Sequence, residues 1–312
     1  MTNDEYRMTN SVRMSVLQRV IEVRERLRRA GISPDQATID AEILARHALG
    51  QDRATYLAHR DESIADDVSE RLEAMVRRRE GREPVAYILG EREFWGLSFL
   101  VSPAVLIPRP ETEAIVEKAL ALMDDAGRAW RLADVGTGSG CLAVALARER
   151  ANANVIATDI SEPALGVAAA NAARHGVDSR IRLIRTSLLD DVPAPFDIIV
   201  ANPPYVPGYS RNGVQPDVRD YEPETAVFGH GADGLDEVRN LLTQAPEKLT
   251  PGGWLLMEFG FGQGDEVRAA VSGVPELRLV EVLCDLQGLE RTLVARTSGS
   301  DAVKQSQILN SV

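Results

Sequence analysis

The strongest constraint on the fold of this chain is a regular alternation of short apolar runs with helical segments, which begins at Arg131. Strand-sized runs separated by helices predict a doubly wound α/β fold, in which helices cover both faces of a mostly parallel sheet. No internal repeat or low-complexity block interrupts the pattern. The expected strands are residues 131–136, 154–160, 181–187, 196–201, 253–259, 276–284 and 290–296.

The amino-terminal part of the chain has a different periodicity. Between Ser15 and about Arg79, apolar residues recur at helical spacing. They include Val16, Val20, Val23 and Leu27 in one segment and Ile39, Ile43, Leu44 and Ala48 in the next. Ser33-Pro34-Asp35 supplies a capping residue and a first-turn proline for the second helix. We therefore expect a small helical bundle over residues 1–80, with the Arg77-Arg78-Arg79 run on a solvated helix face rather than in a contact patch.

The segment after the bundle changes to the alternation that is typical of strands. Its apolar residues Phe94, Leu97, Phe99 and Val101 are interrupted by Gly96 and Pro103. This pattern predicts a β-hairpin linker over residues 81–105 and a second, larger domain over residues 106–297. Residues 1–12 are polar and irregular, and residues 298–312 are aperiodic and rich in serine. We expect both ends to be disordered tails.

Composition limits the partners and the compartment. The formal net charge of -12 argues against a chain that binds nucleic-acid backbone, because phosphate neutralisation needs clustered Lys and Arg. No stretch approaches the roughly 18 apolar residues that a membrane-spanning helix needs. Cys141 and Cys284 lack the spacing of a metal site or a redox pair, and we expect both to be small core residues in a reducing compartment. These features predict a cytoplasmic protein with no membrane partner and no metal.

A glycine-rich turn marks a candidate cofactor site. The first strand runs into Gly136-Thr137-Gly138-Ser139-Gly140, whose glycines allow the backbone to approach a ligand. Asp134, just before the turn, would repel a pyrophosphate but suits a ligand that carries an amino group. Asp159 ends the next strand, about 20 residues on, where a carboxylate can accept both ribose hydroxyls. We therefore expect residues 136–140 and Asp159 to bind S-adenosylmethionine rather than a nicotinamide cofactor.

The strand at 196–201 ends in Asn202-Pro203-Pro204-Tyr205, which predicts the chemistry. The lone pair of an amide or exocyclic amine nitrogen is delocalised, so the nitrogen must be aimed. The Asn202 side-chain oxygen and the Pro203 carbonyl can accept its two N–H bonds. Tyr205 can pack beside a planar substrate. We interpret Asn202, Pro203 and Tyr205 as catalytic residues that hold and border the acceptor. Read alone, the tetrapeptide could also be a turn after a core strand, which is the less favoured interpretation.

Taken together, these motifs resemble those of the protein (glutamine-N5) methyltransferase family that modifies peptide chain release factors, the HemK/PrmC family. The resemblance extends over residues 15–296. It rests on the segments 40–44, 81–90, 93–96, 106–113, 136–140, 202–205, 222–223 and 233–235, and on Glu258 and Gln263.

The resemblance implies a Rossmann-like, S-adenosylmethionine-dependent methyltransferase sheet, preceded by a helical domain that helps to dock the substrate. It implies transfer of a methyl group to the glutamine N5 of the Gly-Gly-Gln motif in class 1 release factors. By the same resemblance, residues 136–140, Asp159 and Asn202 would contact the cofactor, and Asn202, Pro203, Pro204 and Tyr205 would bind the glutamine. Two alternatives are left open by residues 202–205. An N6-adenine nucleic-acid methyltransferase would use the same two acceptors, and a docking protein could keep the fold without the reaction.

Two segments depart from the family pattern. The family often has an aspartate-containing segment beside the adenine where this chain has Thr186-Ser187-Leu188, so Ser187 is the expected adenine contact. The segment 228–232 is one residue longer than usual, and we expect its His230 to be a solvated turn residue without a catalytic role. In the segment 111–113, Glu111, Thr112 and Glu113 suit ordinary helix capping as well as they suit a functional role.

Overall fold

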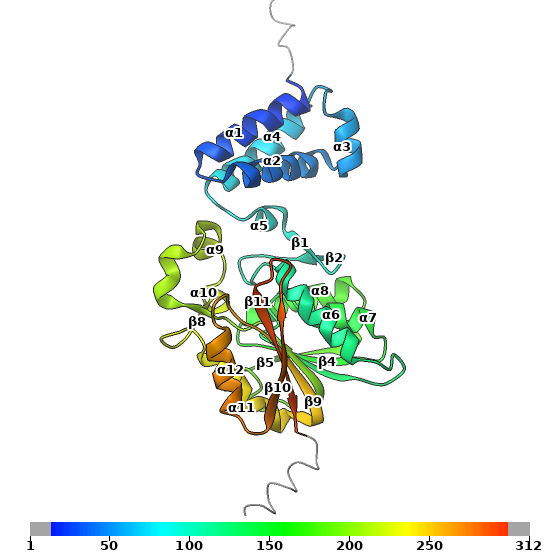
Figure 1. The fold of residues 1–312 in the computed structure, drawn as a ribbon. Helices are drawn as coiled ribbons and strands as arrows, with labels where there is room; N and C mark the ends of the chain where they lie inside the picture. The colour runs from blue at the N-terminus through cyan, green and yellow to red at the C-terminus, as the bar shows by residue number, and fades with distance from the viewer. Residues whose placement is uncertain (1–13, 299–312) are drawn as a thin grey trace, which may run out of the picture. The chain divides into compact units, whose positions relative to one another are not determined.

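The structure is a computed structural model that describes residues 14–298 (Figure 1). The chain divides into two compact units, Met1–Leu89 and Gly90–Val312. Apart from Ser298, the tails expected at residues 1–12 and 298–312 lie outside the described residues. Within the described range, none of the helices combines the length and the apolar character needed to cross a membrane.

The first unit is the expected helical bundle. Its helices are α1 (Val16–Arg29), α2 (Pro34–Leu49), α3 (Arg53–His59), α4 (Asp66–Glu80) and α5 (Val85–Leu89). Ser15 forms a capping box at α1, because its hydroxyl accepts from the Gln18 backbone N–H and its own N–H donates to Gln18 Oε1. Ser33 caps α2 in the predicted place. The apolar faces of the helices meet in one core that includes Val23, Leu27, Leu44, Leu72 and Val76.

The prediction of a solvated face for Arg77-Arg78-Arg79 is wrong for Arg79. That side chain is buried, and its Nε donates to Asp40 Oδ2 over 2.7 Å. The pair joins α4 to α2 inside the bundle. The sequence pattern could not predict this pair, because Asp40 and Arg79 are 39 positions apart in the chain. Arg77 and Arg78 keep exposed side chains and bind the carboxylates of Glu73 and Glu83.

The linker is shorter than predicted. Residues 85–89 form α5 instead of extended chain, since Pro84 begins a helical turn whose carbonyl accepts from the N–H groups of Tyr87 and Ile88. The hairpin consists of β1 (Glu91–Phe94) and β2 (Leu97–Leu100). Trp95 and Gly96 both have positive φ, 52° and 66°, as a two-residue hairpin turn requires.

The second unit contains the predicted sheet of seven strands, in the order β10-β11-β9-β6-β3-β4-β5. The strands are β3 (Arg131–Val135), β4 (Asn154–Asp159), β5 (Ile181–Arg185), β6 (Phe196–Ala201), β9 (Leu249–Glu258), β10 (Leu277–Cys284) and β11 (Glu290–Thr297). Strands β9, β6, β3, β4 and β5 are parallel, and β11 and β10 are antiparallel at one edge.

The chain reverses its direction across the sheet between β3 and β6. From β3 it builds outward through β4 to β5, and then it returns to place β6 on the other side of β3. Open α/β sheets bind their ligands at the carboxyl ends of the strands at such a reversal. The turn after β3 and the segment after β6 are therefore brought together.

Helices cover both faces of this sheet and create two cores (Figure 1). On one face lie α6 (Glu113–Leu122), α7 (Cys141–Glu149) and α8 (Glu162–Arg174), and on the other lie α11 (Asp236–Lys248) and α12 (Gly264–Ser272). The shorter elements are η1 (Pro110–Thr112), η2 (Asp178–Arg180), β7 (Val206–Pro207), η3 (Gly208–Gly213), α9 (Pro216–Tyr221), α10 (Glu224–Val227) and β8 (Phe228–Gly229). Strands β7 and β8, which were not predicted, pair with each other.

The two cysteines differ from the expectation that both are core residues. Cys284 is exposed, because it is the last residue of the edge strand β10. Cys141 is partly buried at the start of α7. Burial raises the pKa of the Cys141 thiol to about 12, so this thiol is un-ionised at neutral pH.

Candidate functional site

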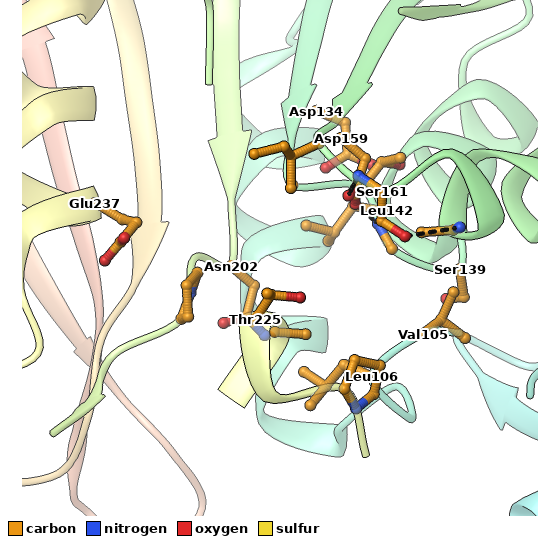
Figure 2. A pocket seen from close by; sticks show the side chains of 18 of the residues that line it. Val105, Leu106, Asp134, Ser139, Leu142, Asp159, Ser161, Asn202, Thr225 and Glu237 are labelled. Carbon is orange, nitrogen blue, oxygen red and sulfur yellow. Dashed lines mark hydrogen bonds between the residues drawn. The ribbon is translucent and has the colours of Figure 1, made fainter. Parts of the chain in front are cut away.

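A cavity of about 300 Å³ lies at the carboxyl ends of β3, β4, β5 and β6 (Figure 2). Four consecutive sheet segments contribute to it, as the chain reversal predicts. Of the expected site residues, Gly136, Thr137, Gly138, Ser139, Asp159, Ser187, Asn202 and Pro204 line this cavity. Gly140 does not line it and begins α7 instead. Pro203 and Tyr205 line a neighbouring cavity.

The glycine turn has the backbone geometry that its sequence suggested. Gly136, Gly138 and Gly140 have φ values of 70°, 53° and 80°, which favour glycine. At Gly140 a Cβ atom would lie 3.2 Å from Cα and Cβ of Ala168, so the turn also packs tightly against α8. The Thr137 backbone N–H donates to the Thr158 carbonyl oxygen over 2.8 Å and ties the turn to β4. The turn is thus held open beside the cavity.

Asp134 presents an unsatisfied carboxylate oxygen at this turn. Its Oδ2 accepts from the Thr137 hydroxyl at 2.6 Å and from the Ala143 backbone N–H at 3.0 Å. Its buried Oδ1 has no partner within residues 14–298. Burial raises the pKa of Asp134 to about 6, and nearby Asp159 adds to the effect. An ammonium group in the cavity would satisfy Oδ1, so the site fits the amino end of S-adenosylmethionine.

The carboxylate of Asp159 is fixed by backbone donors. Its Oδ2 accepts from the Gly138 N–H at 2.9 Å, and its Oδ1 accepts from the Ser161 N–H at 2.8 Å. A carboxylate oxygen can accept a second hydrogen bond, so both oxygens can still receive ribose hydroxyls. Ser187 is an exposed residue in the cavity wall after β5. The adjoining Leu188 has a positive φ of 48°, and its carbonyl accepts from the Thr158 hydroxyl at 2.8 Å.

Asn202 takes part in a partly buried hydrogen-bond chain. Its Nδ2 donates to Thr112 Oγ1 over 3.2 Å, and the Thr112 hydroxyl donates to Glu258 Oε2 over 2.6 Å. The Tyr205 hydroxyl donates to Glu258 Oε1 over 3.0 Å. In the described part of the chain, no group donates to Asn202 Oδ1, which leaves this oxygen for an incoming N–H.

Sequence reasoning missed the roles of Thr112 and Glu258. Thr112 precedes α6, yet its side chain makes no capping hydrogen bond, so the capping interpretation is wrong for this residue. Glu258 follows Met257, which pairs with Ala201 in the parallel register of β9 and β6. Glu258 and Asn202 therefore lie at the carboxyl ends of neighbouring strands. The sequence offered one signal for this, because both residues stand at the end of a predicted strand. Burial raises the pKa of Glu258.

A second cavity of about 90 Å³ adjoins the first and is lined by Pro203 and Tyr205. The two cavities share Leu106, Arg109, Asn202 and Ala226. Asn202 therefore lies between a space large enough for a cofactor and a smaller one beside the Asn-Pro-Pro-Tyr segment. Arg109 is anchored by buried Glu222, whose Oε1 accepts from Nη2 at 2.6 Å.

Gln263 braces the backbone of Tyr205. Its Nε2 donates to the Tyr205 carbonyl at 2.9 Å and to the Asp233 carbonyl at 3.0 Å, while its Oε1 accepts from the Gly260 N–H at 2.8 Å. A Cβ atom on Gly260 would lie 2.5 Å from Gln263 Oε1 and 3.0 Å from Tyr205 Cδ2. Only glycine fits here without displacing the tyrosine.

His230 lies in the outer wall of the large cavity and is exposed, as expected of a solvated turn residue. Its Nδ1 is hydrogen-bonded to Glu237 Oε1, and this carboxylate raises the pKa of His230. The Glu237 Oε2 atom also accepts from the His230 backbone N–H at 3.0 Å. His230 and Glu237 thus bind each other, and neither is hydrogen-bonded to Asn202 within residues 14–298.

Comparison with known proteins agrees with a helical domain followed by a methyltransferase fold. Residues 20–90 match the family described as "PrmC N-terminal domain", and residues 116–215 match "Methyltransferase small domain". The catalytic domain of hMettl16, in complex with MAT2A 3'UTR hairpin 1, matches with a TM-score of 0.53 at 18% identity. The match covers 78% of this chain and 85% of that chain. This structural likeness supports the methyltransferase fold alone.

Sequence relatives share most of their length with this chain. The release factor glutamine methyltransferase of Geobacter sulfurreducens is 44% identical, over 75% of this chain and 80% of its own length. The proteins of the same name from Xylella fastidiosa (strain Temecula1) and Neisseria gonorrhoeae are both 43% identical. They cover 84% and 83% of this chain and 94% and 93% of their own lengths. With its two family matches and the fold described above, the chain belongs to the release factor glutamine methyltransferase family.

Proposed function

We propose that this protein transfers a methyl group from S-adenosylmethionine to the side-chain nitrogen, N5, of the glutamine in the Gly-Gly-Gln motif of class 1 peptide chain release factors. The names of its relatives support the reaction and the substrate. The single structural observation that carries the proposal is the unfilled Oδ1 of Asn202 at the junction of two cavities.

The large cavity supplies what the cofactor needs. Asp134 Oδ1 would receive the ammonium group, Asp159 the ribose hydroxyls, and the turn at 136–140 would let the chain approach the ligand closely. Ser187 would lie beside the adenine. When bound, the cofactor supplies an electrophilic methyl group on a cationic sulfur.

The small cavity suits the acceptor. Asn202 Oδ1 and the Pro203 carbonyl would accept the two N–H bonds of the glutamine amide, while Tyr205 would border its plane. Held in this way, the nitrogen faces the methyl group. The nitrogen would gain the methyl group and release one of its two protons to water. Asn202 is neutral and acts by positioning, not as a base.

The partner and the compartment follow from the same proposal. A class 1 release factor is the protein partner, and neither a nucleic-acid substrate nor a membrane enters the reaction. An enzyme with this substrate must work where translation ends, so we also propose the cytoplasm.

The decisive measurement is transfer of labelled methyl from S-adenosylmethionine to a purified release factor. A release factor with its Gly-Gly-Gln glutamine replaced and unmethylated duplex DNA serve as the alternative acceptors. We expect label on the intact release factor only. Label on DNA alone would support the N6-adenine alternative and reject the glutamine substrate.

The Asn202→Ala variant tests the catalytic residue. Loss of Oδ1 removes an acceptor that aims the nitrogen, so we expect kcat to fall at least about a hundredfold. The Kd for S-adenosylmethionine, measured by calorimetry, should stay within about twofold, because its ammonium group and ribose would be held by Asp134 and Asp159. A kcat close to that of the unsubstituted enzyme would show that Asn202 does not hold the acceptor.

A further inference from the structure

Three segments that are far apart in the sequence meet behind Asn202. Thr112 ends η1, Tyr205 follows β6, and Glu258 is the last residue of β9. We propose that Glu258 is a positioning residue, which through Thr112 fixes the orientation of the Asn202 amide and directly fixes Tyr205. The inference rests on the proposed function and adds to it the groups that set the geometry of the acceptor site.

The argument depends on the direction of each hydrogen bond. In its ionised form the Glu258 carboxylate can only accept, so the Thr112 hydroxyl then donates its single hydrogen to Glu258 Oε2, 2.6 Å away. The Thr112 oxygen is then left as an acceptor, and it takes the Nδ2–H of Asn202 at 3.2 Å. The amide group of Asn202 is thereby oriented with Oδ1 away from Thr112.

Without the carboxylate, the hydrogen bond between Thr112 and Asn202 can reverse its direction. A free Thr112 hydroxyl could donate to Asn202 Oδ1, which would turn Nδ2 toward the substrate. Two N–H donors would then face each other, and the glutamine nitrogen would lose an acceptor. The carboxylate therefore decides which end of the Asn202 amide is offered to the substrate.

Burial makes this control effective. Thr112 and Glu258 are each only 2% exposed, so bulk water does not compete for their hydrogen bonds. The second oxygen of Glu258 accepts from the Tyr205 hydroxyl at 3.0 Å. Burial also raises the pKa of Tyr205, which keeps its hydroxyl protonated and able to donate. One carboxylate thus fixes two residues of the Asn-Pro-Pro-Tyr segment.

A matched pair of variants of the full chain separates positioning from packing. Thr112→Val keeps the shape of the side chain but removes the hydroxyl, whereas Thr112→Ser keeps the hydroxyl. We expect Thr112→Val to lower kcat for release factor methylation at least roughly tenfold, with the KM for the release factor and the Kd for S-adenosylmethionine within about twofold. Thr112→Ser should restore at least about a third of the kcat of the unsubstituted enzyme.

Two further variants complete the test. Thr243 is exposed on α11 and donates to the Arg239 carbonyl, so Thr243→Val is a matched loss of a hydroxyl outside the site and should leave kcat unchanged. In Glu258→Gln the amide oxygen can still accept from the Tyr205 hydroxyl while the amide N–H faces Thr112, so this variant should lower kcat through Thr112 alone. If the residues act in one chain, the Thr112→Val, Glu258→Gln double variant is no slower than Thr112→Val alone.

The outcomes distinguish this inference from the proposed function. Transfer by the unsubstituted enzyme with Thr112→Val within about twofold of its kcat would overturn the positioning role. Independent, multiplicative losses in the double variant would do the same. Absence of transfer by the unsubstituted enzyme would overturn the proposed function and this inference with it.

Discussion

At the scale of single residues, the site is built from buried polar groups whose hydrogen-bonding capacity is only partly used. Asp134 Oδ1 and Asn202 Oδ1 are both left without a donor within residues 14–298. The Asp134 oxygen is buried, and an unfilled buried acceptor is costly unless a ligand supplies its partner. The two oxygens lie on neighbouring strands, β3 and the end of β6, and are suited to two different ligands.

Because the pKa of Asp134 is raised, we expect cofactor binding to depend on pH. Burial raises its pKa to about 6, so the carboxylate that would receive the ammonium group is largely protonated at pH 5 and charged at pH 7. The Kd for S-adenosylmethionine should therefore fall as the pH rises from 5 to 7. Calorimetry across this range should show the trend in the unsubstituted protein and a flat profile for Asp134→Asn. At pH 7 that variant should bind at least roughly tenfold more weakly.

The same group acts in the opposite direction on the stability of the free protein. A carboxyl whose pKa is raised by folding contributes stability below about pH 4, and this contribution is lost as the pH rises through about 6.

Asp197 provides the control for the effect of Asp134→Asn on cofactor binding. It lies at the far end of β6, where its carboxylate binds Arg128 and the Arg131 N–H. Asp197→Asn should leave the cofactor Kd unchanged. An equal loss of affinity in this control would assign the effect to general destabilisation.

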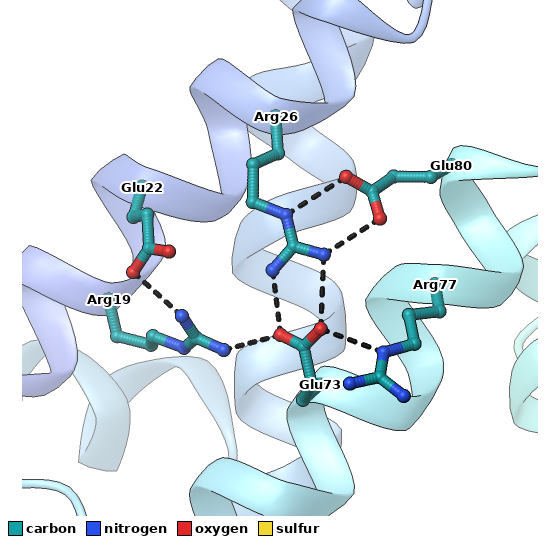
Figure 3. Close-up of polar contacts among 6 residues, drawn as sticks. All are labelled: Arg19, Glu22, Arg26, Glu73, Arg77 and Glu80. Atoms are coloured by element: carbon teal, nitrogen blue, oxygen red, sulfur yellow. Dashed lines mark hydrogen bonds and ion pairs between the residues drawn. The ribbon is translucent and has the colours of Figure 1, made fainter.

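At the scale of secondary-structure elements, charged side chains join the helices of the first unit. Figure 3 shows Arg26 of α1 bound to both Glu73 and Glu80 of α4, with Arg19 and Arg77 also bound to Glu73. The Arg26 guanidinium holds the pKa of Glu73 at about 2. Three arginines on one carboxylate form a network, which contributes more than an isolated surface pair.

Replacing Glu73 should loosen α1 from α4. Glu73→Gln removes the charge shared by three arginines, and we expect it to lower the free energy of unfolding of this unit by about 1 kcal/mol, a figure reduced for solvent screening. Because the pKa is lowered by folding, the contribution of Glu73 is present above about pH 4.5 and is lost as the pH falls toward 2.

Hydrogen–deuterium exchange of the α1 and α4 amides at neutral pH measures this effect. Glu25→Gln is the matched control, because among the described residues Glu25 pairs with Arg24 and Arg28, half-exposed side chains on α1 itself. Exchange should quicken in Glu73→Gln and stay near the unsubstituted rate in Glu25→Gln. Equal rates in the two variants would show that the network does not join the helices.

At the scale of the whole molecule, the cofactor cavity is lined by residues of the second unit alone. Each unit has its own hydrophobic core, so a ligand bound by one need not stabilise the other. At a concentration of 100 times its Kd, S-adenosylmethionine should stabilise the second unit by about 2.7 kcal/mol through binding to the native state.

Hydrogen–deuterium exchange with and without S-adenosylmethionine tests this independence. We expect added protection in the strands β3, β4 and β6 and in the segments that border the cavity, and little change in α1 to α5. Protection that extends equally over the helical bundle would show that the two units unfold as one cooperative body.

The sequence by itself determined the local structure and the chemical types of the site. Apolar periodicity and turn residues act within a few positions of the chain, so the seven strands, the bundle and the glycine turn could all be predicted. The tetrapeptide at 202–205 could be found because it directly follows a strand, and Asp159 because it ends one. The same local rules failed at Pro84, where a single helical turn replaced the expected extended chain.

Only the tertiary structure decided which distant side chains meet. Thr112 and Glu258 are separated by 146 positions and Arg79 and Asp40 by 39, and a buried pair of this kind leaves no trace in local periodicity. Strand order brought β9 beside β6 and thereby set Glu258 behind Asn202. The direction of hydrogen bonds in that cluster depends on three-dimensional packing, which excludes water and leaves each polar group only its neighbours as partners.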